Sequence, residues 1–119
     1  MKTGRKISGG KYKKSRKKKL FEKAGQPRKT LLGKLKTKFL RTRGGAHKLI
    51  SLSQETVNIM VKGKSKKAKI KNVVETPSNR FWARQNLLVK GAIIETDLGK
   101  ARITNRPSQE GQVQAVLVG

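Results

Sequence analysis

Apolar and polar residues alternate along short stretches in the last third of the chain. Segments rich in Gly, Pro, Asp and Ser, at residues 97–100 and 107–111, separate these stretches. Short alternating runs divided by turn signals are typical of antiparallel strands in a meander or a small barrel. We therefore expect a mainly β fold, a small antiparallel β-barrel or meander, whose C-terminal strands lie at residues 92–96, 101–104 and 113–115.

A hairpin is predicted upstream, with strands at residues 36–43 and 47–52 joined by a turn at Gly44-Gly45. The same region also fits a basic amphipathic helix, because four apolar residues fall on one helical face: Leu31, Leu32, Leu35 and Phe39. Such a helix would bind a membrane surface or a calmodulin-like partner. We favour the hairpin, since Gly33 interrupts the helix and the segment that follows fits a period of two equally well.

A second hairpin is predicted from a strand at residues 55–61, a turn at 62–65 and a strand at 66–74. Alternation gives the last strand one mainly apolar face and one lysine-rich face. The two sets are Ala68, Ile70, Asn72 and Val74, and Lys67, Lys69, Lys71 and Val73. A lysine-rich sheet face is suited to lie across a phosphate backbone, although an ordinary solvated face has the same composition.

A turn followed by a short helix is predicted at residues 76–86. Phe81 and Trp82 lie among arginines there, and aromatic and guanidinium surfaces of this kind stack on unpaired bases. We favour the alternative that Phe81, Trp82 and Leu87 close one end of the β core. A chain with three Phe, one Trp and one Tyr needs its aromatic residues inside.

The composition limits the chain to one small domain. Its 119 residues, 34% of them apolar, can fill one small core. Because cysteine is absent, disulfides and thiolate metal sites are excluded. No apolar run approaches the roughly 18 residues of a membrane span, and no apolar stretch follows the basic N-terminus as it would in a secretory signal. We therefore expect a soluble intracellular protein with no membrane partner.

The net charge of +25, from 31 basic and 6 acidic residues, favours a nucleic-acid partner whose phosphates would relieve the self-repulsion. Residues 1–50 hold 19 basic residues and one acid, a net of +18, whereas residues 51–119 have a net of +7. We expect residues 1–29 to form a flexible, largely disordered RNA-binding arm on a β-barrel core at residues 30–119. A nuclear-localisation signal is an alternative, but it needs only about 5–8 residues.

The candidate RNA-binding residues are lysines and arginines of the arm and of the core. In the arm they are Arg5, Lys6, Lys11, Lys13, Lys14, Arg16, Lys17, Lys18 and Lys19. In the core they are Arg41, Arg43, Lys48, Lys67, Lys69, Lys71, Arg80, Arg84, Arg102 and Arg106. Around the glycine turn, glycines would allow close approach to a phosphate and arginines would supply forked donors. An ordinary loop with solubilising charges is the alternative there.

No active site is expected. Glu95 and Asp97 would share a strand face and could form a magnesium pair, but acids on a sheet surface are more often cross-strand partners of basic residues. His47 has no second histidine, cysteine or nearby acid, which favours a surface or turn role. The Gly-Lys pairs lack the spacing and context of a phosphate-binding loop. We therefore expect no enzymatic activity, no metal or other cofactor and no small-molecule substrate.

Several segments form an ordered set along nearly the whole chain. They are RKISGG at residues 5–10, RTRGG at 41–45, AKIKNVVETPSNR at 68–80, KGAIIETDLGKARITNRP at 90–107 and EGQVQAVLV at 110–118. Together they resemble the small-subunit ribosomal protein family called S-eight-e, in its compact archaeal form. The resemblance implies a structural constituent of the cytoplasmic ribosome that binds small-subunit rRNA through a basic arm and a small β-barrel, beside neighbouring ribosomal proteins. A free-standing RNA chaperone or ribosome-assembly factor is the alternative.

Overall fold

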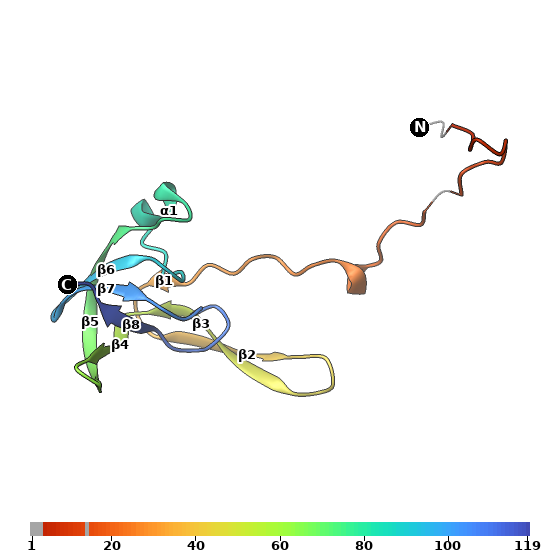
Figure 1. The fold of residues 1–119 in the computed structure, drawn as a ribbon. Helices are drawn as coiled ribbons and strands as arrows, with labels where there is room; N and C mark the ends of the chain where they lie inside the picture. The colour runs from red at the N-terminus through yellow and green to blue at the C-terminus, as the bar shows by residue number, and fades with distance from the viewer. Residues whose placement is uncertain (1–3, 14) are drawn as a thin grey trace.

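The structure, a computed structural model, describes residues 4–13 and 15–119 (Figure 1). Strands dominate these residues. In chain order the elements are η1 (Leu20–Glu22), β1 (Leu31–Leu32), β2 (Lys36–Arg41), β3 (His47–Gln54), β4 (Thr56–Val61), β5 (Lys64–Glu75), α1 (Arg80–Arg84), β6 (Ile93–Thr96), β7 (Gly99–Ile103) and β8 (Gln114–Leu117). The predicted mainly β fold is therefore confirmed.

Strands β4 to β8 form a closed barrel in the order β4-β5-β6-β7-β8. Consecutive strands pair antiparallel, as predicted, but β8 pairs with β4 in parallel, from Asn58 opposite Gln114 to Met60 opposite Val116. The strand number requires this seam, because the first and last of five up-and-down strands run in the same direction. The barrel is thus antiparallel everywhere except where it closes.

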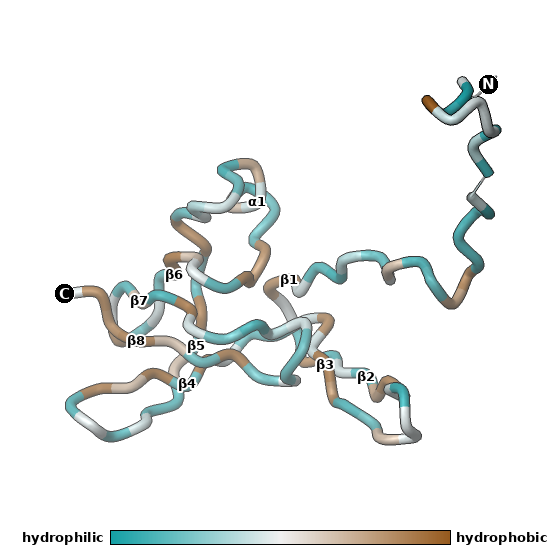
Figure 2. Tube along the Cα trace, turned by 45° about the vertical axis from the view of Figure 1, so that its right-hand side comes forward, coloured by the Kyte–Doolittle hydropathy of each residue, from teal (hydrophilic) through white to brown (hydrophobic). Residues whose placement is uncertain are grey.

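Aliphatic side chains fill the barrel and alternate with exposed polar residues along its strands. The buried members of this core are Val57, Ile59, Ala68, Ile70, Val73, Leu88, Ala92, Ile94, Ala101, Ile103, Val113 and Ala115. In Figure 2 brown residues recur between teal ones along the barrel strands, while teal dominates the N-terminal segment. Successive side chains of a strand point to opposite faces, so the period of two read from the sequence places every second residue inside.

One part of the predicted alternation is wrong, at the C-terminal end of β5. Ile70 pairs with Thr96, but the next pair joins Asn72 to Glu95, so β5 has an extra residue at this point. Such a bulge shifts the side chains that follow it to the other face, up to the next irregularity, which lies between Val73 and Glu75. Val73 is therefore buried and Val74 is 46% exposed, the reverse of the expected order.

The predicted hairpin is confirmed, and it lies outside the barrel. Strands β2 and β3 pair antiparallel, and β1 adds to β3 in parallel to give a three-stranded sheet. The amphipathic helix considered as an alternative is wrong. Three of its four apolar residues lie in β1 and β2, and the fourth, Leu35, is exposed just before β2. Gly44 and Gly45 both have positive φ, 88° and 86°, a conformation that glycine adopts without strain. Figure 1 shows the hairpin projecting from the barrel on the same side as the N-terminal segment.

The predicted short helix is also confirmed, as α1. The Asn79 side chain caps it by accepting a hydrogen bond from the Phe81 backbone N–H at 3.0 Å. Leu87 is buried, as expected, and Trp82 is half-buried, but the placement of Phe81 inside the core is wrong because its side chain is 62% exposed. No residue of this five-residue helix is fully buried; Trp82 and Ala83 are half-buried, and Phe81 faces solvent.

The N-terminal segment extends away from the barrel (Figure 1), and the described molecule measures 69 × 34 × 26 Å. Its described residues are exposed up to residue 29, whereas Thr30 is buried. Two local structures interrupt the extended path. Residues 5–11 form a tight turn in which the Lys6 N–H donates to the Gly10 carbonyl oxygen at 2.8 Å, and residues 20–22 form η1. We refer to residues 4–13 and 15–29 as the arm.

Candidate nucleic-acid interface

The outer face of β5 presents a row of exposed lysines. Ala68 and Ile70 point into the barrel, so Lys67 and Lys69, which flank Ala68, point to solvent. Lys71 is also exposed and lies 3.4 Å from Asp97, measured between Nζ and a carboxylate oxygen. Residues two apart on a strand are about 6.8 Å apart along it, so these side chains form a line rather than a cluster. A line of cations matches the shape of a phosphate backbone.

The hairpin candidates do not gather at the glycine turn. Arg41 is exposed on β2, and Arg43 at the turn donates a hydrogen bond from Nη2 to the Phe21 carbonyl oxygen of the arm at 3.2 Å. Lys48 points elsewhere, because its ammonium group donates to the Gln109 side chain in the β7–β8 loop. The turn therefore offers two exposed arginines, and the third predicted residue makes a contact within the protein.

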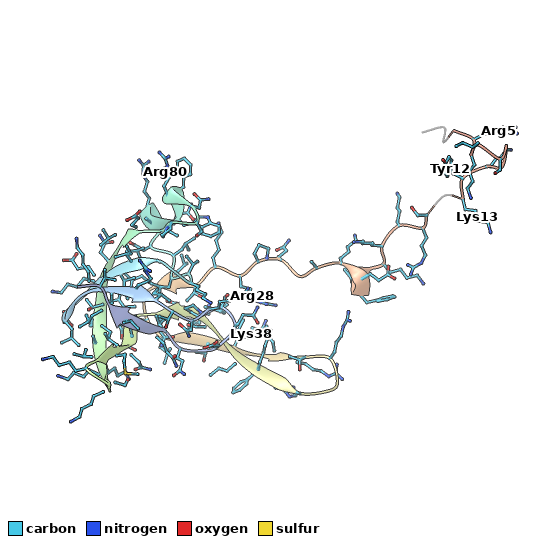
Figure 3. The ribbon with its side chains drawn as sticks, in the orientation of Figure 1. Arg5, Tyr12, Lys13, Arg28, Lys38 and Arg80 are labelled. Carbon is cyan, nitrogen blue, oxygen red and sulfur yellow. The ribbon has the colours of Figure 1, made fainter. Side chains whose placement is uncertain are left out.

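Helix α1 carries Arg80 and Arg84, both exposed and one helical turn apart. Figure 3 labels Arg80 on this helix, which lies beyond the end of β5. Arg102 is exposed on β7, opposite Val116 of β8. Arg106 follows in the β7–β8 loop and lines a hollow together with Arg28 of the arm. The core candidates are thus distributed over several elements, and Arg106 shares a hollow with a cation of the arm.

The arm carries the remaining candidates, all exposed except Lys14, which lies outside the described residues. Some of them make local contacts. The Arg5 guanidinium donates to the Gly9 carbonyl oxygen at 3.3 Å, and the Lys6 ammonium lies 5.8 Å from the centre of the Tyr12 ring. Figure 3 labels Arg5, Tyr12 and Lys13 near the far end of the arm. The other exposed candidates of this segment are Lys11, Lys13, Lys17, Lys18 and Lys19.

Glu22, the one acid among residues 1–50, organises the arm around η1. Its carboxylate accepts from both Nη atoms of Arg16 and from the Lys19 backbone N–H at 3.0 Å. The Arg16 hydrogen bond, and next the one from Lys19, lower the pKa of the Glu22 carboxyl below its ordinary value of 4.5. An anion in a cationic segment therefore gives this part of the arm a fixed local shape.

Two acidic residues of the described core lie beside basic ones. Asp97 faces Lys71, and Glu95 pairs in register with Lys100 on the neighbouring strand. Across residues 4–13 and 15–119, no group of three or more His, Cys, Asp or Glu residues could hold a metal ion. His47 is exposed at the start of β3. Within the same residues no helix is long and apolar enough to cross a membrane.

The cations that line hollows with Arg106 were not among the residues predicted from the sequence. Arg28 and Lys90 line hollows that also contain Arg106. Arg28 lies within the predicted arm, but it falls outside the dense lysine run that drew attention to residues 11–19. Lys90 stands alone between apolar residues, and no local pattern marks it. Their place beside Arg106 depends on the fold, which brings together segments that are far apart in the chain.

The family model described as Ribosomal protein S8e matches residues 1–118 of the chain. The small ribosomal subunit protein eS8 of Methanocorpusculum labreanum is 44% identical over 98% of this chain and 95% of its own length. Proteins of the same name from Halorubrum lacusprofundi and Nanoarchaeum equitans are 40% and 42% identical, over 96% and 94% of this chain and 93% and 90% of their own lengths. These names describe a ribosomal component and no enzymatic activity. The match extends over nearly the whole length on both sides, and the chain belongs to the ribosomal protein S8e family.

Proposed function

We propose that the protein is a structural constituent of the small ribosomal subunit in the cytoplasm and binds its rRNA through lysines and arginines. The observation that carries this proposal is the distribution of charge. The net charge is +25, and exposed cations lie on the arm, the hairpin, β5 and α1, outside a core of aliphatic residues. A surface of this kind binds phosphates at many points rather than one small ligand.

In this mechanism the exposed cations bind the RNA, and the barrel positions the segments that carry them. Lys and Arg side chains neutralise backbone phosphates and release counterions, which supplies affinity without reading sequence. The barrel fixes where the arm and the hairpin begin, so the cations reach a folded RNA in a defined arrangement. Side chains cannot read the deep major groove of A-form RNA, so recognition rests on shape and backbone. Neighbouring ribosomal proteins are further proposed partners.

Sedimentation of ribosomal particles through sucrose gradients, at increasing salt, tests this function. A structural constituent stays with mature small subunits at one copy per particle until high salt. Release at modest salt, or presence only in immature particles, would instead indicate an assembly factor or an RNA chaperone. Migration at the top of the gradient at every salt concentration would contradict the proposal. A tagged copy expressed in its native host allows the stoichiometry to be measured in each fraction.

A further inference from the structure

A groove lies where the arm meets the folded core, and cationic residues from three segments line it. Residues 25–28 form one wall, and Arg106, Ser108 and Gln109 of the β7–β8 loop form the other. An adjoining hollow is lined by Arg28, residues 88–90 and residues 106–108. The two hollows adjoin, since they share Arg28, Arg106 and Ser108, and we refer to them together as the Arg28–Arg106 groove, which also includes Lys90. Figure 3 labels Arg28 at the base of the arm.

Two walls of this groove are anchored to a single residue of β3, Ser51. The Ser51 backbone N–H donates to the Pro107 carbonyl oxygen at 3.1 Å. The Ser51 carbonyl oxygen accepts a hydrogen bond from the Thr30 hydroxyl at 2.8 Å. Ser51 is 0% exposed and Thr30 is 1% exposed, so water does not compete for these bonds. The loop that carries Arg106 and the chain that leads to Arg28 are therefore held at the same point.

The third segment is attached to the same anchor. The Leu88 backbone N–H donates to the Thr30 carbonyl oxygen at 2.8 Å, and Leu88 itself is buried in the barrel core. Lys90 follows two residues later. Each cation thus lies one or two residues from a fixed position. The backbone next to each cation is therefore tied to the folded core before any ligand arrives, and preorganisation of this kind lowers the cost of binding.

The chemistry of the groove suits a phosphate group. Two guanidinium forks, one ammonium group and the Ser108 hydroxyl supply donors, and no residue lining either hollow is acidic. Glu110, the acid of this loop, accepts a hydrogen bond from the Asn105 side chain at 3.0 Å. Arginine forks match two phosphate oxygens at once. Bringing like charges together costs self-repulsion in the free protein, and an anion in the groove removes that cost.

We propose that the Arg28–Arg106 groove binds one phosphodiester of the rRNA backbone and so fixes the point at which the arm enters the RNA. This inference rests on the proposed rRNA-binding function and assigns it a specific site. The arm by itself is exposed and extended, and its cations could meet phosphates at many positions. A phosphate held at the base of the arm gives all the following contacts a common origin.

The test is a filter-binding measurement of the intact protein on an in vitro transcript of its own small-subunit rRNA, at a series of salt concentrations. The variants are Arg28→Gln, Arg106→Gln and the double variant, with Lys62→Gln/Lys100→Gln as a control of equal charge change. If both arginines hold one phosphate, each single variant removes most of that interaction. The double variant then weakens binding roughly 10- to 100-fold and lowers the log–log salt slope by about 0.7–0.9.

A charge-preserving pair, Arg28→Lys/Arg106→Lys, separates fork geometry from charge. It should weaken binding less than the glutamine pair and leave the salt slope near that of the wild type. A double glutamine variant that binds like the control would overturn the inference, and so would additive single effects with a slope change equivalent to two phosphates. Both results leave the proposed function intact, because that function is tested separately, by whether the wild-type protein binds the rRNA and stays with mature small subunits.

Discussion

The arm and the barrel use opposite balances of charge and apolar surface. The barrel buries its aliphatic side chains in one core, whereas the apolar residues of the arm are left outside, with Leu20 87% exposed and Phe21 67% exposed. A small protein cannot bury enough surface to order its whole chain. Here the apolar residues are concentrated in the barrel strands, and the N-terminal quarter is left exposed and rich in cations. An average composition hides this division.

The largest effect is expected from deletion of residues 5–19, which separates affinity from stability. Removal of this many cations should weaken rRNA binding about 1,000-fold or more at moderate salt and reduce the salt slope by about 0.7–0.9 for each phosphate that the arm neutralises. Thermal unfolding of the barrel should not change, since this segment makes no part of the core. Filter binding and calorimetry measure the two effects. An unchanged slope would show that the arm does not touch RNA.

The second prediction concerns the barrel alone. Ile59 is 0% exposed, so Ile59→Ala removes buried methylenes and leaves a cavity, at a cost of about 2–5 kcal/mol in the free energy of unfolding. Leu20→Ala, at an exposed arm position, should change that free energy by no more than about 0.5 kcal/mol. Urea denaturation of both variants measures the contrast. Equal destabilisation would mean that Leu20 packs against the core in solution.

The hairpin occupies an intermediate position, because it is regular in structure but lies outside the barrel. Gly44→Ala forces a side chain into a backbone with φ of 88° and should cost about 1 kcal/mol. The destabilisation should appear as faster hydrogen exchange of β2 and β3 amides, with the barrel amides unaffected. Gly4→Ala, in the exposed arm, serves as the control. Equal acceleration in the barrel would show that hairpin and barrel unfold together.

The smallest effect is expected from the titration of Glu22 in the arm. Its pKa is lowered below 4.5 by Arg16 and by the Lys19 N–H, so the ion pair stabilises η1 at neutral pH. That contribution is fully present above the ordinary pKa and is lost as pH falls through the lowered value. The Lys19 amide resonance should follow the Glu22 carboxyl in an NMR titration, and Glu22→Gln should abolish the transition. Independent titration of the two signals would contradict the contact.

The features that depend on local pattern were predictable from the sequence. The period of two identified the barrel strands, the glycine pair identified the hairpin turn, and Asn79 marked the start of α1. The inversion of Val73 and Val74 was not, because the β5 bulge is set by pairing with β6 rather than by β5 itself. The prediction that Phe81 is buried was also wrong. It rested on the small number of aromatic residues, which does not determine which face of a short helix packs on the core.

The sequence predicted which kinds of residue form the candidate interface, but it did not predict how they are arranged in space. Exposed lysines on the arm and on β5 follow from charge and alternation, whereas their roles in RNA binding stay predictions. The groove required three segments to meet, and the hydrogen bonds that join them run through Thr30 and Ser51, two small polar residues with no individual signal. Lys48 shows the opposite case, because a residue chosen for its neighbours in sequence has its partner in a distant loop.

The parallel seam between β4 and β8 also constrains how the protein is made. The strand that closes the barrel ends at Leu117, while its partner β4 begins at Thr56, so the core cannot be completed until almost the whole chain has been synthesised. The arm precedes the barrel strands in the chain, so it is synthesised before them. The proposed contact between residues 5–19 and RNA would therefore not depend on barrel closure, whereas the Arg28–Arg106 groove can form only after residue 106 has been synthesised and the most distant pairing is in place.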